Sequence, residues 1–107
     1  MYGLAAIGEA AVDRLIPLLH DADDDTVRLA VHALGEMGTA AEDAEPALCG
    51  MLANQDAEIR QRAADALGNC QGPEPNLTIP ALIKLLDDED KRVPRVAAAS
   101  INRLVCL

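Results

Sequence analysis

The sequence predicts an all-α protein: an α-solenoid, wound as a right-handed superhelix from about three helical hairpins plus an N-terminal partial repeat. Two observations carry this prediction. Leu15, Leu48 and Leu82 recur at intervals of 33 and 34 residues, and further sets of residues keep the same two intervals. Within each interval, apolar residues twice follow the helical period, with an acidic stretch between the two runs. Such a fixed period is typical of solenoids, in which neighbouring repeats complete one another's core.

The same period divides the chain into units. The 107 residues are long enough for one domain, residues 1–107, and too short for a second independent core. The predicted repeats cover approximately residues 11–38, 44–72 and 78–107. Residues 1–8 are interpreted as the remnant of a preceding helix, because GLAAIG matches the tail of a later second helix, ALGEMG.

The first helix of each hairpin is predicted from its apolar run and from its proline. These runs are residues 11–19, 44–52 and 78–86. Pro46 and Pro80 are expected in the first turn of their helices, where a missing N–H costs nothing. Pro17 falls inside the first run, where we expect a kink or a later helix start.

The second helix of each hairpin is predicted from its caps. These runs are residues 26–38, 58–70 and 92–104. Asp56 and Asp90 directly precede two of them and are placed to cap their first turns. Gly38 and Gly72 follow and are expected to end the helices. Each repeat is therefore a helical hairpin with an acidic turn.

Composition limits the partners. The net charge of −9 opposes a phosphate backbone, and the chain has no Trp or Phe on which bases could stack. No run approaches the ~20 apolar residues of a membrane span. We expect a cytoplasmic protein that binds neither nucleic acid nor membrane.

The sequence offers no convincing catalytic, cofactor or metal site. The acidic run at residues 21–25 begins like a calcium loop, but Thr26 and His32 stand where that loop needs Gly and Glu. His20 and His32 have unlike residues at the equivalent repeat positions, which favours solvent exposure over chemistry. The three cysteines show no CxxC pairing. Cys49 and Cys70 are expected in the core, and Cys106 is expected to react readily.

Two strings, IPALIKLLDDED and IRQRAADALG, resemble the short HEAT-like repeats of the phycobilisome-lyase type, over roughly Ala11 to the C-terminus. The resemblance implies Asp and Arg residues that form a hydrogen-bonded ladder along the stack. The family positions hold Asp21 with Arg28, Asn54 with Arg60, and Asp88 with Arg95. The family includes scaffolds, lyases, hydroxylases and nucleic-acid enzymes, so the resemblance specifies fold more than function.

We expect a non-catalytic protein-binding or assembly scaffold that uses the concave face lined by its second helices. The candidate binding residues on that face are Arg28, His32, Gln61, Asp65, Arg95 and Arg103. The alternative is a subunit or fragment of a bilin lyase-like enzyme that needs a partner chain, and a piece of a longer repeat array is compatible with either. Apolar residues near both ends also predict a homodimer through the terminal helices.

Overall fold

The computed structural model describes residues 4–105, with side chains described from residue 10 onward. Its elements, in chain order, are α1 (Leu4–Leu15), η1 (Ile16–His20), α2 (Asp24–Glu36), η2 (Gly38–Ala44), α3 (Glu45–Met51), α4 (Ala57–Cys70), α5 (Pro75–Lys84), η3 (Leu85–Asp87) and α6 (Arg92–Val105), where η denotes a 3-10 helix. No strand occurs in this range. The predicted all-α class is confirmed.

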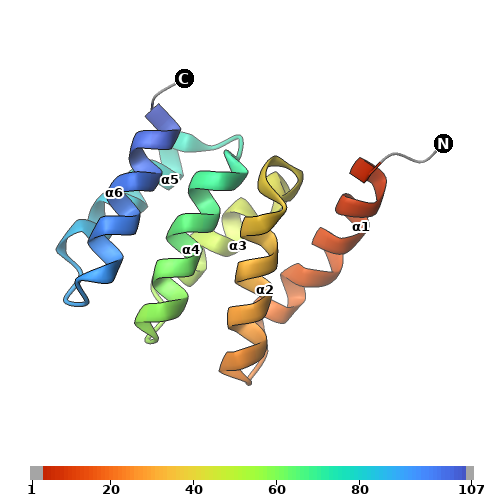
Figure 1. Ribbon diagram of the computed structural model, residues 1–107, viewed down its shortest axis with the longest axis horizontal. Coiled ribbons are helices and arrows are strands. Elements are labelled where there is room, and N and C mark those ends of the chain that lie inside the picture. Colours follow the sequence, from red (N-terminus) through yellow and green to blue (C-terminus); the bar gives the residue numbers. More distant parts are fainter. Residues whose placement is uncertain (1–3, 106–107) are drawn as a thin grey trace.

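The helices form two layers. Figure 1 shows α2, α4 and α6 side by side, with α3 and α5 behind them and α1 at the N-terminal end. We call α1–α2, α3–α4 and α5–α6 the first, second and third pairs, and α2, α4 and α6 the second helices. Neighbouring second helices make the most extensive contacts in the molecule. The result is the predicted α-solenoid, with extents of 46 × 36 × 18 Å.

The core lies between the layers and repeats with the sequence. Leu48 and Leu82 are fully buried, and so are Leu34 and Leu67 on the second helices. Small residues at the Ala30 position, repeated as Ala63 and Ala97 in the other pairs, are buried where helices approach closely. Residues that recur at the 33- and 34-residue intervals are therefore buried at equivalent places in the packing, because each pair leaves one apolar face for its neighbour to cover.

Aspartates begin the second helices. The carboxylates of Asp23 and Asp56 accept hydrogen bonds from the backbone N–H groups of Asp25 and Glu58, two residues on. Asp90 accepts in the same way from the N–H of Arg92, at 3.0 Å. These bonds satisfy donors that a helix start leaves free. The predicted capping by Asp56 and Asp90 is confirmed.

Two prolines lie in unexpected places. Helix α5 starts at Pro75, so Pro80 sits inside it and not in its first turn as predicted. The earlier proline fills the position where no N–H is needed. Of the two expectations for Pro17, a kink or a later helix start, the later start does not occur. Instead, α1 ends at Leu15 and the chain tightens into η1, which carries the proline in its first turn.

Helix α1 also runs without a break from Leu4 to Leu15. The predicted remnant and the start of the first repeat therefore belong to one helix. Gly8, which closes the matched string GLAAIG, does not end the helix, so that string by itself does not mark a helix end. The limits of the repeats otherwise stay a prediction.

Gly38 and Gly72, which follow two of the second helices, are required for different reasons. Gly38 has φ +59° and ends α2 in the left-handed conformation, as predicted. After α4 that conformation is taken by Gln71, with φ 46°, and not by Gly72. Gly72 is small for another reason: a Cβ there would overlap the side chain of Glu45.

Candidate protein-binding face

An Arg–Asp ladder joins the pairs at their acidic turns. Arg28 on α2 donates to Asp56 of the next turn at 2.6 Å and also contacts Asp25 in its own helix. These acids raise the pKa of Arg28, first through the hydrogen bond with Asp25. Each rung thus ties a second helix to the turn of the following pair.

The second rung is more enclosed. Arg60 donates to both carboxylate oxygens of Asp88, at 2.8 and 3.0 Å, and to the backbone carbonyls of Asn54 and Gln55. The side chains of Arg60 and Asp88 are only 13% and 9% exposed. The Arg60 hydrogen bond holds the pKa of Asp88 below its usual value. The ladder implied by the family resemblance is confirmed here and at Arg28.

Its expected members are partly wrong. Asp21 does not pair with Arg28; its carboxylate accepts the N–H of Asp23 in its own turn. Arg95 is exposed and has no hydrogen-bond or ion-pair partner within residues 10–105, so it forms no rung with Asp88. The residue after the buried Val93, where the other pairs carry the ladder arginine, is Pro94. A proline cannot supply the cation.

Three adjoining hollows cross the face of the second helices, and together we call them the second-helix groove. The first, between α2 and α4, holds about 380 Å³ and is lined by Asp25, Arg28, Leu29, His32, Glu58 and Arg62. The central one, about 220 Å³, is lined by Val31, His32, Gly35, Glu36, Glu58, Gln61, Arg62, Asp65 and Val96. The third, about 370 Å³, is lined by Gln61, Asp65, Arg92, Arg95, Val96 and Ala99. Shared lining residues make the groove continuous across all three second helices.

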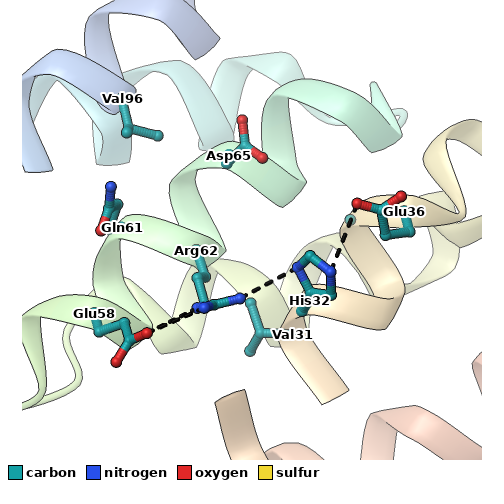
Figure 2. Close-up of a pocket in the computed structure, with 9 residues that line it drawn as sticks. Val31, His32, Glu36, Glu58, Gln61, Arg62, Asp65 and Val96 are labelled. Carbon is teal, nitrogen blue, oxygen red and sulfur yellow. Dashed lines mark hydrogen bonds and ion pairs between the residues drawn. The ribbon is translucent and has the colours of Figure 1, made fainter. Parts of the chain in front are cut away.

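A chain of polar contacts crosses the centre of the groove. Figure 2 shows Arg62 reaching from Glu58 on its own helix to His32 on α2. The guanidinium can only donate, so Nδ1 of His32 accepts this hydrogen bond at 3.2 Å. Nε2 of the same ring lies 3.6 Å from Glu36. These contacts hold Arg62 and His32 in place at the centre of the groove.

A second set of contacts fixes the rim formed by α6. Arg103 donates to Asp65 at 2.9 Å and to the amide oxygen of Asn69. Asn69 in turn donates to the backbone carbonyl of Gly35 on α2, at 3.3 Å. The three second helices are thereby linked in sequence, from α2 through α4 to α6.

The six predicted binding residues do not share one role. His32, Gln61, Asp65 and Arg95 line the groove, and Arg28 lines its N-terminal end while serving as a ladder rung. Arg103 lines none of the three hollows and instead holds Asp65 and Asn69. Gln61 and Arg95 have no hydrogen-bond or ion-pair partner within residues 10–105, so they are the predicted residues most available to a partner.

A buried acid, Glu45, joins α3 to the start of α5, and the sequence did not predict this contact. Glu45, 2% exposed, accepts hydrogen bonds from the hydroxyl of Thr78 at 2.8 Å and from the N–H of Glu74 at 2.9 Å. It also lies in the first turn of α3, where the helix dipole favours a negative charge. The signal was present: at the 33- and 34-residue intervals the same position holds the apolar Val12 and Ile79.

The cysteines follow the core prediction in part. Cys70 is fully buried, and burial raises the pKa of its thiol to about 11. Cys49 is only partly buried, with its sulfur 3.7 Å from the hydroxyl of Thr78, and burial raises its pKa as well. The prediction for Cys106 lies outside the described residues. Among the described residues no group of three or more His, Cys, Asp or Glu side chains could hold a metal ion.

Comparison with known families decides the classification. The family model for HEAT repeats matches residues 12–102. The chain is a HEAT-repeat protein. HEAT repeats generally mediate protein interactions. No described helix is long and apolar enough to cross a membrane.

Solved structures agree with the fold. Thirteen chains of solved structures match, among them the crystal structure of an engineered protein from the Northeast Structural Genomics Consortium. That protein has a TM-score of 0.74 and 28% sequence identity over 86% of this HEAT-repeat chain, which spans 44% of the engineered chain's length. No curated protein matches the sequence.

Proposed function

We propose that this HEAT-repeat protein is a non-catalytic protein-binding scaffold of the cytoplasm, and that a protein segment binds along the second-helix groove. The observation that carries the proposal is the continuity of the groove over α2, α4 and α6. Concave surfaces of stacked helices are the usual binding surfaces of solenoids. A segment lying along such a groove contacts every pair at once.

The chemistry of the groove supports a peptide with both polar and apolar side chains. Leu29, 70% exposed, and the partly buried Val96 offer apolar contacts at two points along it. Gln61 supplies an amide and Arg95 a cation, neither occupied by a partner within residues 10–105. An acidic side chain of the partner would pair with Arg95, and its backbone would pair with Gln61.

The prearranged contacts favour binding over catalysis. The side chains of Glu58, Arg62 and His32 are already hydrogen-bonded to one another, and Arg103 is hydrogen-bonded to Asp65. These bonds hold neighbouring second helices together. Side chains fixed in this way lose little entropy when a partner binds. No observation favours the alternative of a bilin lyase-like subunit, so one function is proposed.

The test places a photocrosslinking amino acid at Gln61 in the groove and, as control, at Asn76, an exposed residue of α5 in the other layer. Both forms are expressed in the native cell. We expect Gln61 to crosslink one recurrent protein that Asn76 does not capture. Crosslinks from Asn76 alone would overturn the assignment of the face.

A charge reversal then measures the contribution of the groove to binding of that partner. Arg95→Glu should weaken it roughly tenfold or more, as expected for loss of a charged interface contact. The matched control is Lys91→Glu, which makes the same charge change at an exposed turn residue outside the groove. Equal loss in both variants would point to net charge and not to the groove.

A further inference from the structure

Most charged side chains that line the second-helix groove are already paired with an opposite charge. The pairs are Arg28 with Asp25 and Asp56, Arg62 with Glu58, Asp65 with Arg103, and Arg92 with Asp90. A charge compensated in this way offers a ligand little net attraction. Glu36 on α2 and Arg95 on α6 are left without an oppositely charged partner within residues 10–105.

Glu36 keeps its negative charge uncompensated although it contacts a histidine. Its carboxylate lies 3.6 Å from Nε2 of His32. Because Nδ1 of that ring accepts a hydrogen bond from Arg62, it carries no proton, and the imidazole is neutral. A neutral ring does not offset a carboxylate. Glu36, with its side chain 73% exposed, therefore presents a free negative charge at the central hollow.

Arg95 presents a free positive charge at the third hollow. Its place on the α4 side of α6 differs from that of Arg28, which reaches the turn of the following pair. The equivalent hollow between α2 and α4 stays open although another pair follows it. The openness of the third hollow therefore does not depend on where the described chain ends.

The two free charges lie on one diagonal path. The central and third hollows share Gln61, Asp65 and Val96, and Figure 2 shows Glu36 across the central hollow from Gln61 and Val96. Glu36 ends α2, whereas Arg95 is in the first turn of α6. Two helix spacings and the offset along the axes give roughly 20–25 Å between them, which an extended chain covers in about six to eight residues.

We infer that the occupant of the groove is an extended protein segment with a basic side chain against Glu36 and an acidic side chain against Arg95, about six to eight residues apart. This inference rests on the proposed function and names the partner's chemistry. The unpartnered amide of Gln61 lies between the two charges, and an extended backbone leaves N–H and C=O groups free to meet it. The charges also fix the direction of the segment, because the reverse direction sets like charges together.

The probe is a library of random twelve-residue peptides displayed on phage and selected on the full chain. We expect the enriched peptides to carry one basic and one acidic residue at the inferred spacing, in a single order. Glu36→Lys and Arg95→Glu should each weaken a selected peptide roughly tenfold in fluorescence anisotropy. The double variant should prefer the same peptide with its two charges exchanged. Asp43→Lys and Lys91→Glu, matched charge changes at exposed residues outside the groove, should have little effect.

A further variant, Gln61→Trp, separates this inference from the proposed function, because it fills the place where the two hollows meet. Peptides that are lost on Gln61→Trp but lack the charge pair, or that tolerate both Glu36→Lys and Arg95→Glu, would overturn the inference and leave the groove as the binding site. If no peptide is enriched, or none is lost on Gln61→Trp, the proposed function and the inference both fail.

Discussion

The two junctions between pairs use the same positions with different chemistry. At the first, Arg28 and Asp56 form the rung with side chains 26% and 30% exposed. At the second, Arg60 and Asp88 are about half as exposed or less, and the arginine also closes on two carbonyls. Identical sequence spacing therefore does not give equal contacts, because enclosure depends on what surrounds each rung.

The buried contacts inside the two junctions also differ: they are apolar at the first junction and include hydrogen bonds at the second. At the first, Gly35 packs on Ala66, a contact between small apolar groups. At the second, the hydroxyl of Ser100 donates to the carbonyl of Ala64 at 2.6 Å in a buried setting, and Glu45 adds its buried bonds to Thr78. Buried polar contacts demand exact partners, so the second junction should tolerate change less well.

The largest effect should come from Leu67, the fully buried residue of α4, the helix that both junctions share. Leu67→Ala should destabilise the protein by about 2–5 kcal/mol, because it removes buried surface and leaves a cavity. Gln61→Ala on the groove side of the same helix should be nearly silent. Denaturant unfolding measures both, and equal midpoints would contradict the division into core and groove faces.

Glycine substitutions compare the junctions directly. Gly68→Ala would bring its Cβ within 2.9 Å of the Cβ of Ser100, and should cost about 1–3 kcal/mol through overpacking. Gly35→Ala would place its Cβ 3.3 Å from the Cβ of Ala66, which is a milder overlap than at Gly68, and the gain in helix propensity opposes its cost. Thermal unfolding of the two variants should rank Gly68→Ala lower. The reverse order would show that the first junction is the tighter one.

The rungs should follow the same ranking with smaller differences. Arg60→Ala should cost about 1–2 kcal/mol, between the values for exposed and buried ion pairs. Arg28→Ala should cost less, because its partners are more exposed. Equal losses of unfolding free energy in the two variants, measured by chemical denaturation, would show that the lower exposure of the Asp88 rung does not add to stability.

Acid should weaken the second rung. The Arg60 hydrogen bond lowers the pKa of folded Asp88 below 3.8, so its contribution is present above that pH and is lost as pH falls through the folded pKa. The pKa of Asp90 is lowered in the same way, to about 2, by its hydrogen bonds with Arg92. The stability difference between the unchanged chain and Asp88→Asn, measured by urea unfolding, should shrink below about pH 4. A difference independent of pH would exclude this linkage.

Much of the fold was predictable because its causes are local. The period of leucines, the capping aspartates and Gly38 each act within a few residues, so the sequence alone indicated helices, turns and their stacking. Local signals failed where two candidates competed. Pro75 and not Pro80 began α5, and Gln71 and not Gly72 took the left-handed turn.

For the candidate site, the sequence indicated the face, since residues such as Gln61 and Arg95 fall opposite the core side of their helices. It could not distribute the roles: that Arg28 reaches the turn of the next pair, that Arg103 braces Asp65, or that Glu45 meets Thr78. These contacts join residues 28 to 38 positions apart. Helical periodicity fixes which side of a helix a residue occupies, whereas only the packing of one pair on the next fixes which partner it meets.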